Sequence, residues 1–368
     1  MTSKVFFIDF RATFKENFPA KLTRLVKMAG MRERFSERDM VAVKLHFGEL
    51  GNTAFIRPVF IRNIIDAIKS SGGIPFLTDA NTLYAGSRGN SPHHLETAMR
   101  NGFAYSVTGA PMIIADGLKG RSHSVVAINL KRFKKVYIGA EIEQADSIIS
   151  VAHFKGHELS GFGGAIKNLG MGCASRRGKL AQHSTLAPFV KQKKCAGCGD
   201  CAERCVNRAI FMVEKKAKID EKKCVGCGEC ILICPNSAID IHWNQATPVF
   251  LENMAEYTFG VLKGKEGKTF CVNFLTDISP ACDCYPLNDA PIVRNIGVLA
   301  STDPVAIDQA SVDLVNGEAA LPGSCLKKNR EPGQDKFKGI YPNVDWNIQL
   351  DYAEQIGVGT RSYELVRL

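Results

Sequence analysis

Eight of the thirteen cysteines in this 368-residue chain fall in two runs with the same spacing, C-x-x-C-x-x-C-x-x-x-C. Thiolates separated in this way can bind three corners of a cubane iron–sulfur cluster, and the glycines between them let the backbone turn tightly. The fourth cysteine of such a run binds the other cluster, so the two runs are predicted to exchange their last ligands. One 4Fe–4S cluster would then be held by Cys195, Cys198, Cys201 and Cys234, and a second by Cys224, Cys227, Cys230 and Cys205.

The two cysteine runs belong to a longer internal repeat. The stretch KKCAGCGDCAERCVNRAI, which starts at Lys193, aligns with KKCVGCGECILICPNSAI, which starts at Lys222. Together they resemble a bacterial two-cluster ferredoxin over about fifty residues. The second run ends in Cys-Pro as in that family, whereas the first ends in Cys205-Val206. Zinc is the alternative occupant, but zinc sites usually combine two C-x-x-C pairs rather than two quartets. The resemblance implies that this segment transfers electrons.

The elements on either side of this segment alternate between strands and helices. Strands are predicted at 4–10, 40–47, 73–80, 135–142, 147–154, 269–278 and 296–301, and helices at 18–31, 57–71, 91–102, 303–317 and 346–356. In the helix at 57–71 the apolar residues recur at helical spacing, with Pro58 near its start and Gly72 after its end. The alternation predicts an α/β fold, with a doubly wound, mostly parallel sheet and an inserted α+β ferredoxin-like domain.

We expect a single α/β domain that the cysteine-rich segment interrupts. Residues 1–190 would form the first part of that domain, 191–243 the inserted domain with its two clusters, and 244–368 the second part with a C-terminal tail. A ferredoxin insert in this position is expected to supply electrons to a second site or to receive them from it.

Polar side chains follow several predicted strands at their carboxyl ends, where open α/β sheets bind ligands. The residues predicted to bind an anionic group are Lys44, His46, Lys155, Asn168, Lys179 and Asp303. His153 or His157 would transfer protons. Each residue also has an ordinary structural interpretation: the lysines as solvated charges, the histidines as core residues, and Asp303 as a helix cap. The prediction of a site depends on their joint occurrence at several strand ends.

A glycine-rich stretch, GFGGAIKNLGMG, follows one of these strands. Glycines before a helix expose backbone amides that suit a phosphate or a carboxylate, and Lys167 lies six residues after Gly161. The stretch is not a nucleotide P-loop, because no G-K-[ST] follows. It is therefore predicted to bind an anion together with Lys167, with a plain glycine-rich turn as the alternative.

Five cysteines lie outside the two runs. Cys271 falls in an apolar strand and is predicted to be an inert core thiol, while Cys325 lies in a polar loop. Nearby cations would lower the pKa of Cys173, although it could equally be a packed small residue. Cys282 and Cys284 form a C-D-C pair. Thiolates in these places could bind a metal, attack a substrate or relay electrons. The predicted catalytic residues are His153, His157, Lys167, Cys173, Cys282 and Cys284.

The formal net charge is +10, which two clusters with their thiolates would reduce to about +6. The basic residues are spread along the chain without a nucleic-acid-binding motif, so a small anionic substrate or an electron-donor or electron-acceptor protein is the expected partner. A homo-oligomer is possible. No apolar run reaches the length of a membrane span, and the N-terminus does not look like a signal peptide, so we expect a cytoplasmic protein.

Three further stretches extend the resemblance to nearly the whole chain. VKLHFGELGNTAFIRP, HFKGHELSGFGGAIKNLGMGC and CDCYPLNDAPIVRNIGVLASTDPVAIDQA together resemble the domain-of-unknown-function 362 family of iron–sulfur-centre proteins, many of which carry a ferredoxin insert. The resemblance implies a cytoplasmic, anaerobic redox protein and no particular reaction. HELSGFGGAIKNLGMG is also similar to the His–Gly-rich–Lys run of the nickel-pincer lactate racemase family, with Lys167 at the cofactor-carrying position. That similarity implies a related fold.

The leading hypothesis from the sequence is an oxidoreductase. It would pass electrons through two 4Fe–4S clusters to or from an anionic substrate or a metallocofactor in the α/β crevice, which could hold a further metal centre. A non-catalytic ferredoxin-type electron carrier or partner subunit is the first alternative. A metallocofactor-dependent isomerase or racemase is the second.

Overall fold

An eight-stranded sheet runs through the body of the protein, in the order β16-β1-β15-β14-β7-β2-β3-β4. The computed structural model describes residues 2–184, 186–242 and 247–368. The strands of this sheet are β1 (Ser3–Asp9), β2 (Met40–Lys44), β3 (Ile74–Asp79), β4 (Met112–Ile114), β7 (Ser147–His153), β14 (Thr269–Leu275), β15 (Gly297–Ser301) and β16 (Tyr363–Arg367). β14, β7, β2, β3 and β4 are parallel neighbours, whereas β15 runs antiparallel to both β1 and β14. The sheet is therefore mostly parallel, as predicted.

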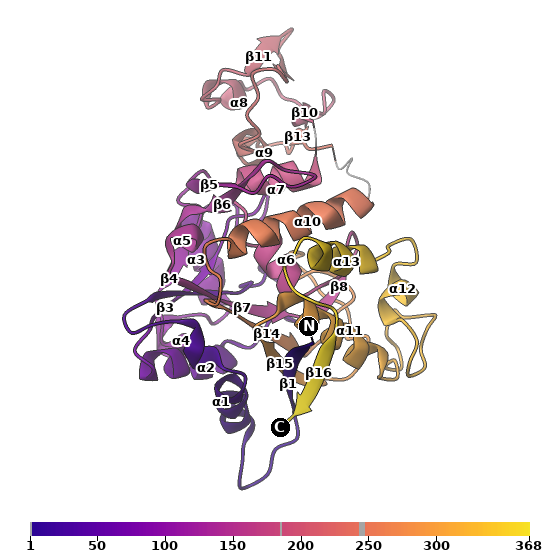
Figure 1. Ribbon diagram of the computed structural model, residues 1–368. Helices are drawn as coiled ribbons and strands as arrows, with labels where there is room; N and C mark the ends of the chain where they lie inside the picture. The colour runs from indigo at the N-terminus through magenta and orange to yellow at the C-terminus, as the bar shows by residue number, and fades with distance from the viewer. Residues whose placement is uncertain (1, 185, 243–246) are drawn as a thin grey trace.

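Helices cover both faces of the sheet (Figure 1). One face packs against α1 (Phe18–Met28) and α2 (Pro58–Ser70), whose buried residues share a hydrophobic core with the strands. The other face packs against α6 (Ala165–Gly170) and α11 (Pro304–Asn316), with α10 (Thr247–Leu262) and α13 (Asn347–Gln355) outside them. The predicted α/β fold with helices on both faces is confirmed.

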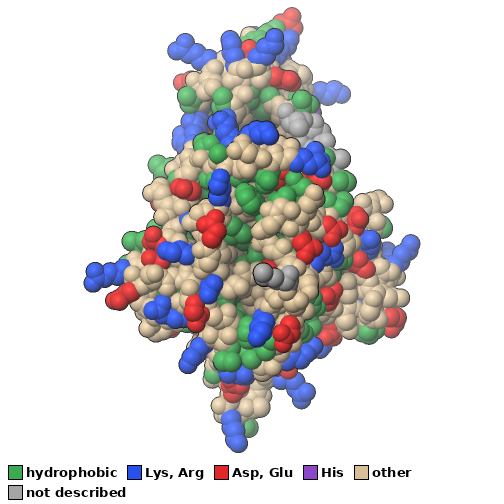
Figure 2. Space-filling model, viewed as in Figure 1, with side chains coloured by type: hydrophobic (Ala, Val, Ile, Leu, Met, Phe, Trp, Pro, Cys, Tyr) green, Lys and Arg blue, Asp and Glu red, His purple; other side chains and the backbone are tan. Residues whose placement is uncertain are grey.

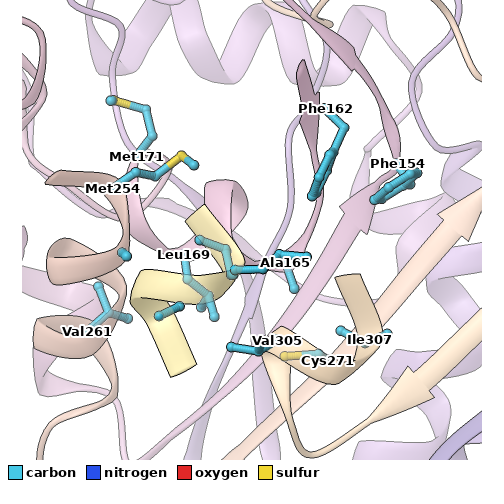
Figure 3. Packing of buried hydrophobic residues seen from close by; sticks show 14 of the residues in the cluster. Phe154, Phe162, Ala165, Leu169, Met171, Met254, Val261, Cys271, Val305 and Ile307 are labelled. Atoms are coloured by element: carbon cyan, nitrogen blue, oxygen red, sulfur yellow. The ribbon is translucent and has the colours of Figure 1, made fainter. Parts of the chain in front are cut away.

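The core on the α6 and α11 side is tightly packed. Cys271 of β14 lies beside Val305 and Ile307 of α11, and Phe154 lies near Phe162 (Figure 3). The side chain of Cys271 has no exposed surface, and burial raises the pKa of its thiol. Cys271 is thus a buried core thiol, as predicted from its apolar strand.

Two parts of the body differ from the predicted elements. The strand predicted at 135–142 is shorter, β6 (Lys135–Gly139), and it pairs with β5 (His123–Ala127) in a separate antiparallel ribbon instead of joining the main sheet. The tail carries β16, which pairs in parallel with β1 at the edge of the sheet (Figure 1). Further short elements are η1 (Met31–Arg34), α3 (Ser91–Arg100), α4 (Tyr105–Thr108), α5 (Ala140–Gln144), β8 (Lys155–His157), β9 (Gly161–Gly163), α7 (Arg176–His183) and α12 (Lys336–Ile340).

The cysteine-rich segment projects from one end of the molecule (Figure 1). It contains β10 (Phe189–Val190), α8 (Asp200–Glu203), β11 (Ile210–Val213), β12 (Lys216–Ile219), α9 (Glu229–Ile233) and β13 (Ile239–Asp240). These elements form two small antiparallel ribbons, β10 with β13 and β11 with β12. The domain boundaries at 190 and 243 remain a prediction.

A buried carboxylate joins this segment to the body. Glu229 of α9 lies 3.2 Å from Arg121, 3.7 Å from Arg176 and 3.8 Å from Lys119. Arg176 has no exposed surface, and its guanidinium also donates to the carbonyls of Thr82 and Gly89. These contacts fix the cysteine-rich segment against the loops that follow β3.

The surface gives two further observations. Lys and Arg side chains are spread over the face in Figure 2, including the projecting end, rather than gathered in one basic patch. Among the residues that the structure describes, no helix has the length and apolar character needed to cross a membrane.

Candidate functional site

A cavity of about 690 Å³ lies beyond the carboxyl ends of β2, β3 and β7. Parallel strands bring their carboxyl ends to one edge of a sheet, which is why residues far apart in the sequence meet there. The predicted residues that line this cavity are Lys44, His46, His153, Lys155, His157, Lys167, Asn168, Lys179, Cys282 and Cys284. Cys173 and Asp303 do not line it.

Lys44, at the end of β2, is held by an ion pair on the cavity wall. Its ammonium lies 3.0 Å from Asp79 at the end of β3, and both side chains are buried. Lys44 also donates to Asn168 (2.9 Å), which in turn donates to the Lys44 carbonyl and to Ser150. Although burial opposes the charge of Asp79, Lys44 and its other neighbours hold the pKa of this carboxyl well below its usual range. The positive charge of Lys44 is thus balanced by a carboxylate of the protein itself.

Arg88 is a buried cation that sequence analysis missed. Its guanidinium lies 3.1 Å from Glu49 and 3.4 Å from Asp79, and it donates to the Tyr84 hydroxyl at 2.7 Å. It stands in the loop between β3 and α3, where no periodic pattern marks it. The only signal for Arg88 in the sequence was indirect. Glu49 and Asp79 lie at or just after the ends of predicted strands, and buried carboxylates need cations nearby.

Asp283, in the C-D-C segment, organises the end of β7. It has no exposed surface and lies 2.8 Å from Nδ1 of His153 and 3.0 Å from Nζ of Lys155. Burial alone would raise the pKa of Asp283, but the adjacent His153 and Lys155 outweigh it and hold that pKa well below its usual range. Nε2 of His153 faces the carbonyl of Thr276 at 2.7 Å. Both ring nitrogens of His153 therefore face acceptors, so this histidine is fixed in place.

The sulfur of Cys282 lies on the cavity wall among hydrogen-bond donors and a cation. The Cys284 thiol donates a hydrogen bond to it, the Lys167 ammonium lies 3.5 Å away, and the backbone N–H of Cys284 lies 3.4 Å away. The Cys284 hydrogen bond, Lys167 and His157 together outweigh burial and hold the pKa of Cys282 well below that of an ordinary thiol. The same pairing raises the pKa of Cys284. The pairing thus favours the deprotonated form at Cys282 and the protonated form at Cys284.

His157 is the histidine positioned to donate a hydrogen bond toward the Cys282 sulfur. Its Nδ1 accepts hydrogen bonds from the backbone N–H groups of Leu159 and Ser160, both at 3.2 Å. The proton of the ring is therefore on Nε2, which leaves that N–H to act as the donor toward Cys282.

His46 also lines the cavity. Its Nδ1 accepts from the backbone N–H of Gly48 at 2.9 Å. Burial, followed by the charge of Arg88, lowers the pKa of His46 well below its usual value. His46 is therefore a neutral, hydrogen-bonded residue of the wall, close to the core interpretation that its sequence allowed.

Lys179 is the lysine on the wall best placed to bind an anion. Its ammonium donates to the carbonyl of Ala174 at 2.5 Å, and no carboxylate of the described residues lies within ion-pair distance. Burial lowers its pKa to about 8. A bound anion would supply the missing negative charge.

The glycine-rich turn does not offer its amides to an external anion. The backbone N–H groups of Ala165 and Ile166 donate to the carboxylate of Asp308 at 2.7 and 3.0 Å. Gly164 is required here, because a Cβ at this position would lie 2.2 Å from the same carboxylate. The turn therefore binds a carboxylate of its own chain, which corrects the predicted anion site at these amides, while Lys167 does reach the cavity.

Two predicted site residues have other positions. Cys173 is buried in the hydrophobic core, where burial raises its pKa to about 12, so the predicted lowering by nearby cations is wrong. Asp303 caps α11: it accepts from the N–H groups of Val305 and Ala306, both at 2.9 Å, and from the Ser3 hydroxyl. The structure thus places neither residue in the cavity.

The eight cysteines of the two runs surround two further cavities in the projecting segment. One is lined by Cys195, Cys198, Cys201 and Cys234. The other measures about 210 Å³ and is lined by Cys205, Cys224, Cys227 and Cys230, together with Cys201. These are the two quartets expected if each run gives its last cysteine to the other site. In addition, backbone N–H groups donate to the sulfurs of Cys205 (3.2 Å), Cys195 (3.5 Å) and Cys234 (3.1 Å).

The donor sets and the backbone N–H···S bonds suit 4Fe–4S clusters. Among the described residues, no three or more His, Cys, Asp or Glu side chains are gathered closely enough to hold a single metal ion. The argument for clusters therefore depends on the spacing of the cysteines and on the two cavities.

Comparison with known proteins places the chain in a family. The family model described as "Domain of unknown function (DUF362)" matches residues 41–313, which include most of the strands and helices around the cavity and the whole projecting segment. The chain belongs to the DUF362 family. The match agrees with the resemblance seen in the sequence, and it assigns no reaction to this DUF362 chain. No curated protein matches it.

Two solved structures are similar to this DUF362 protein at low identity. The lactate racemase apoprotein from Thermoanaerobacterium thermosaccharolyticum matches with 13% identity and a TM-score of 0.38, over 74% of this chain and 51% of that chain. A protein from Thermotoga maritima matches with 9% identity and a TM-score of 0.41, over 92% of this chain and 58% of that chain. The DUF362 chain thus spans between half and three-fifths of the length of these two proteins.

Proposed function

We propose that this protein is an iron–sulfur oxidoreductase that exchanges electrons between two 4Fe–4S clusters and an anionic substrate in the large cavity. Cys195, Cys198, Cys201 and Cys234 would hold one cluster, and Cys224, Cys227, Cys230 and Cys205 the other. The clusters would supply one electron each. The rest of the proposal concerns what the side chains of the chain itself do.

The position of Leu83 is the observation that carries the proposal. Leu83 lines the large cavity, and it also packs in the hydrophobic cluster that contains Cys201, Ile231 and Leu180, with Cys205 and Cys230 against it. A Cβ on Gly228, between two cysteines of the second run, would lie 3.1 Å from Cδ1 of Leu83. Leu83 therefore lies between the cavity and a hydrophobic cluster that includes cysteines of both runs, where a path for electrons between them would run.

The charges of the cavity indicate how it would bind a substrate. Lys44 and Lys155 are paired with buried carboxylates, so they maintain the shape of the site rather than its charge. Among the described residues, no carboxylate lies within ion-pair distance of Lys179, while the ammonium of Lys167 contacts the Cys282 sulfur. An anionic group is thus expected at Lys179, with the sulfur of Cys282 as the reactive atom and the N–H at Nε2 of His157 as a hydrogen-bond donor toward it.

A ferredoxin-type electron carrier is the alternative from another class, but it would have no use for this cavity. Burial of Lys44, Arg88 and Asp283 carries a desolvation cost that only precise pairing offsets. An arrangement of this kind is typical of a substrate site, where rigid side chains position reacting groups.

Anaerobic stopped-flow absorbance tests the proposal. Protein with reduced clusters would be mixed with pyruvate, fumarate, nitrite, sulfite or oxidised glutathione, and reoxidation would be followed in the visible band of the clusters. We expect at least one of these anions to reoxidise the clusters in wild type and in the exposed control Lys134→Met, and to do so at least about tenfold more slowly in Lys179→Met. If none reoxidises them, or if Lys179→Met equals wild type, the proposed substrate site is wrong.

A further inference from the structure

The segment from Cys282 to Tyr285 folds into a turn that brings two cysteines together. The backbone N–H of Tyr285 donates to the carbonyl of Cys282 at 3.1 Å, which is the hydrogen bond of a β-turn. Cys282 and Cys284 are the first and third residues of that turn, and the Cys284 thiol donates to the Cys282 sulfur. The two sulfurs are thus neighbours on the cavity wall, although both thiols are free.

The two cysteines have different surroundings. Cys282 is 1% exposed and faces the Lys167 ammonium at 3.5 Å and the backbone N–H of Cys284 at 3.4 Å. Cys284 lies nearer the opening, beside Tyr84, whose hydroxyl donates to the Cys284 carbonyl at 3.0 Å. A lysine ammonium and a backbone N–H in direct contact with the Cys282 sulfur are the features of an attacking thiolate, which leaves Cys284 as the resolving partner.

We propose that Cys282 and Cys284 are a redox-active dithiol that exchanges with a low-molecular-weight, carboxylate-bearing disulfide bound in the cavity. The inference rests on the proposed function, because it names the substrate class of the same site. A cavity of about 690 Å³ has the size of a small-molecule site, and Lys179 is available for a carboxylate of the ligand.

The exchange proceeds in two balanced steps. The Cys282 thiolate attacks one sulfur of the substrate disulfide, forming a mixed disulfide and releasing one substrate half as a thiolate. Cys284 then gives its proton to the thiolate released first, and its sulfur attacks the Cys282 sulfur, which breaks the mixed disulfide and releases the second half as a thiolate. The cysteine pair is oxidised to an intramolecular disulfide, and the substrate disulfide is reduced to one thiol and one thiolate. The N–H at Nε2 of His157 faces Cys282 and stabilises the attacking thiolate as a hydrogen-bond donor.

Mass spectrometry tests this directly on the intact protein. The protein would be incubated anaerobically with oxidised glutathione, quenched with acid, unfolded, alkylated and digested with trypsin. The peptide that runs from Thr269 to Arg294 holds Cys271, Cys282 and Cys284 and no other cysteine. We expect it to carry one alkyl group after oxidation, on Cys271, and three after reduction with dithiothreitol.

Matched variants separate the two steps. In Cys284→Ser, glutathione is expected to remain attached to Cys282, whereas in Cys282→Ser an adduct on Cys284 forms at least about tenfold more slowly. Cys325→Ser changes an exposed cysteine that does not line the cavity, and it is expected to behave as wild type. Three alkyl groups on the wild-type peptide after glutathione treatment, or no adduct in Cys284→Ser, would overturn the inference.

The same samples separate this inference from the proposed function. The alkylation pattern does not depend on the clusters, whereas iron analysis reports on them alone. Iron with an unreactive cysteine pair would reject only the dithiol, and a reactive pair without iron would reject only the clusters.

Discussion

The ammonium nitrogen of Lys167 lies 3.5 Å from the sulfur of Cys282, although 115 residues separate the two in the sequence. Burial opposes the charge of Lys167, but the neighbouring sulfurs of Cys282 and then Cys284 outweigh it and raise the pKa of the lysine. Each group thus stabilises the charge of the other. The pair connects the glycine-rich stretch to the C-D-C segment. Outside the two cysteine runs, both segments were predicted from the sequence to contribute catalytic residues.

Replacing Lys167 with methionine is expected to raise the pKa of Cys282, because it removes a cation and leaves burial in place. The alkylation rate of Cys282 by iodoacetamide at pH 7 should fall about tenfold or more. The rate would be measured from pH 5 to 9 by mass spectrometry of the peptide that contains Cys282. An unchanged pH profile would show that Lys167 does not stabilise the thiolate, and Lys134→Met serves as the exposed control.

Asp283→Asn is expected to destabilise the protein by about 3–5 kcal/mol at pH 7, because it leaves Lys155 and His153 buried without their carboxylate. The folded-state pKa of Asp283 is depressed, so its stabilising contribution is present above about pH 4 and is lost as the pH falls through the folded-state value. Urea unfolding from pH 3 to 7 should show the difference from wild type shrinking below about pH 4.

The control for that experiment lies in the same loop. Asp289 is exposed, and Asp289→Asn should shift the free energy of unfolding by less than about 0.5 kcal/mol at every pH. Equal effects of Asp283→Asn and Asp289→Asn would contradict the buried pairing.

Anion binding should weaken as Lys179 loses its proton. With a pKa of about 8, Lys179 is charged at pH 7 and mostly neutral at pH 9, so affinity for oxalate should fall about tenfold over this interval. Isothermal titration calorimetry measures the affinity. In Lys179→Arg the side chain stays charged, and the affinity should not change between pH 7 and 9. If the affinity of the wild-type protein for oxalate did not change between pH 7 and 9, the anion would bind elsewhere than at Lys179.

Serine substitutions should show which cluster each last cysteine holds. Cys234→Ser is expected to disturb the cluster of the first run, and Cys205→Ser the cluster of the second run. Each variant should lose about half of its iron. The cluster that remains should be that of the second run in Cys234→Ser and that of the first run in Cys205→Ser. Cys325→Ser, at an exposed loop position, should keep all of it. Loss of the first-run cluster in Cys205→Ser would show that the runs do not exchange ligands.

Sequence patterns predicted the sheet and the meeting of strand ends because both follow from local signals. Alternating strands and helices imply parallel neighbours, and parallel strands bring Lys44, Asp79 and His153 to one edge. The β5–β6 ribbon was missed, since short amphipathic strands do not show which sheet they join.

The charge pairing within the site was beyond sequence reasoning. Nothing local shows that Asp283 neutralises Lys155, or that Arg88 lies between Glu49 and Asp79, because these partners meet only after folding. The prediction for Cys173 was wrong for the same reason. Cations nearby in the sequence suggested a thiol with a lowered pKa, but burial in the core raises that pKa.

Iron analysis combined with an anaerobic reductive titration followed by electron paramagnetic resonance tests the central claim most directly. The account predicts about eight irons per chain, and on reduction two clusters whose signals broaden each other because the two cysteine-lined cavities share Cys201. Zinc in place of iron, or an iron-loaded protein in which fewer than two clusters accept an electron, would contradict it.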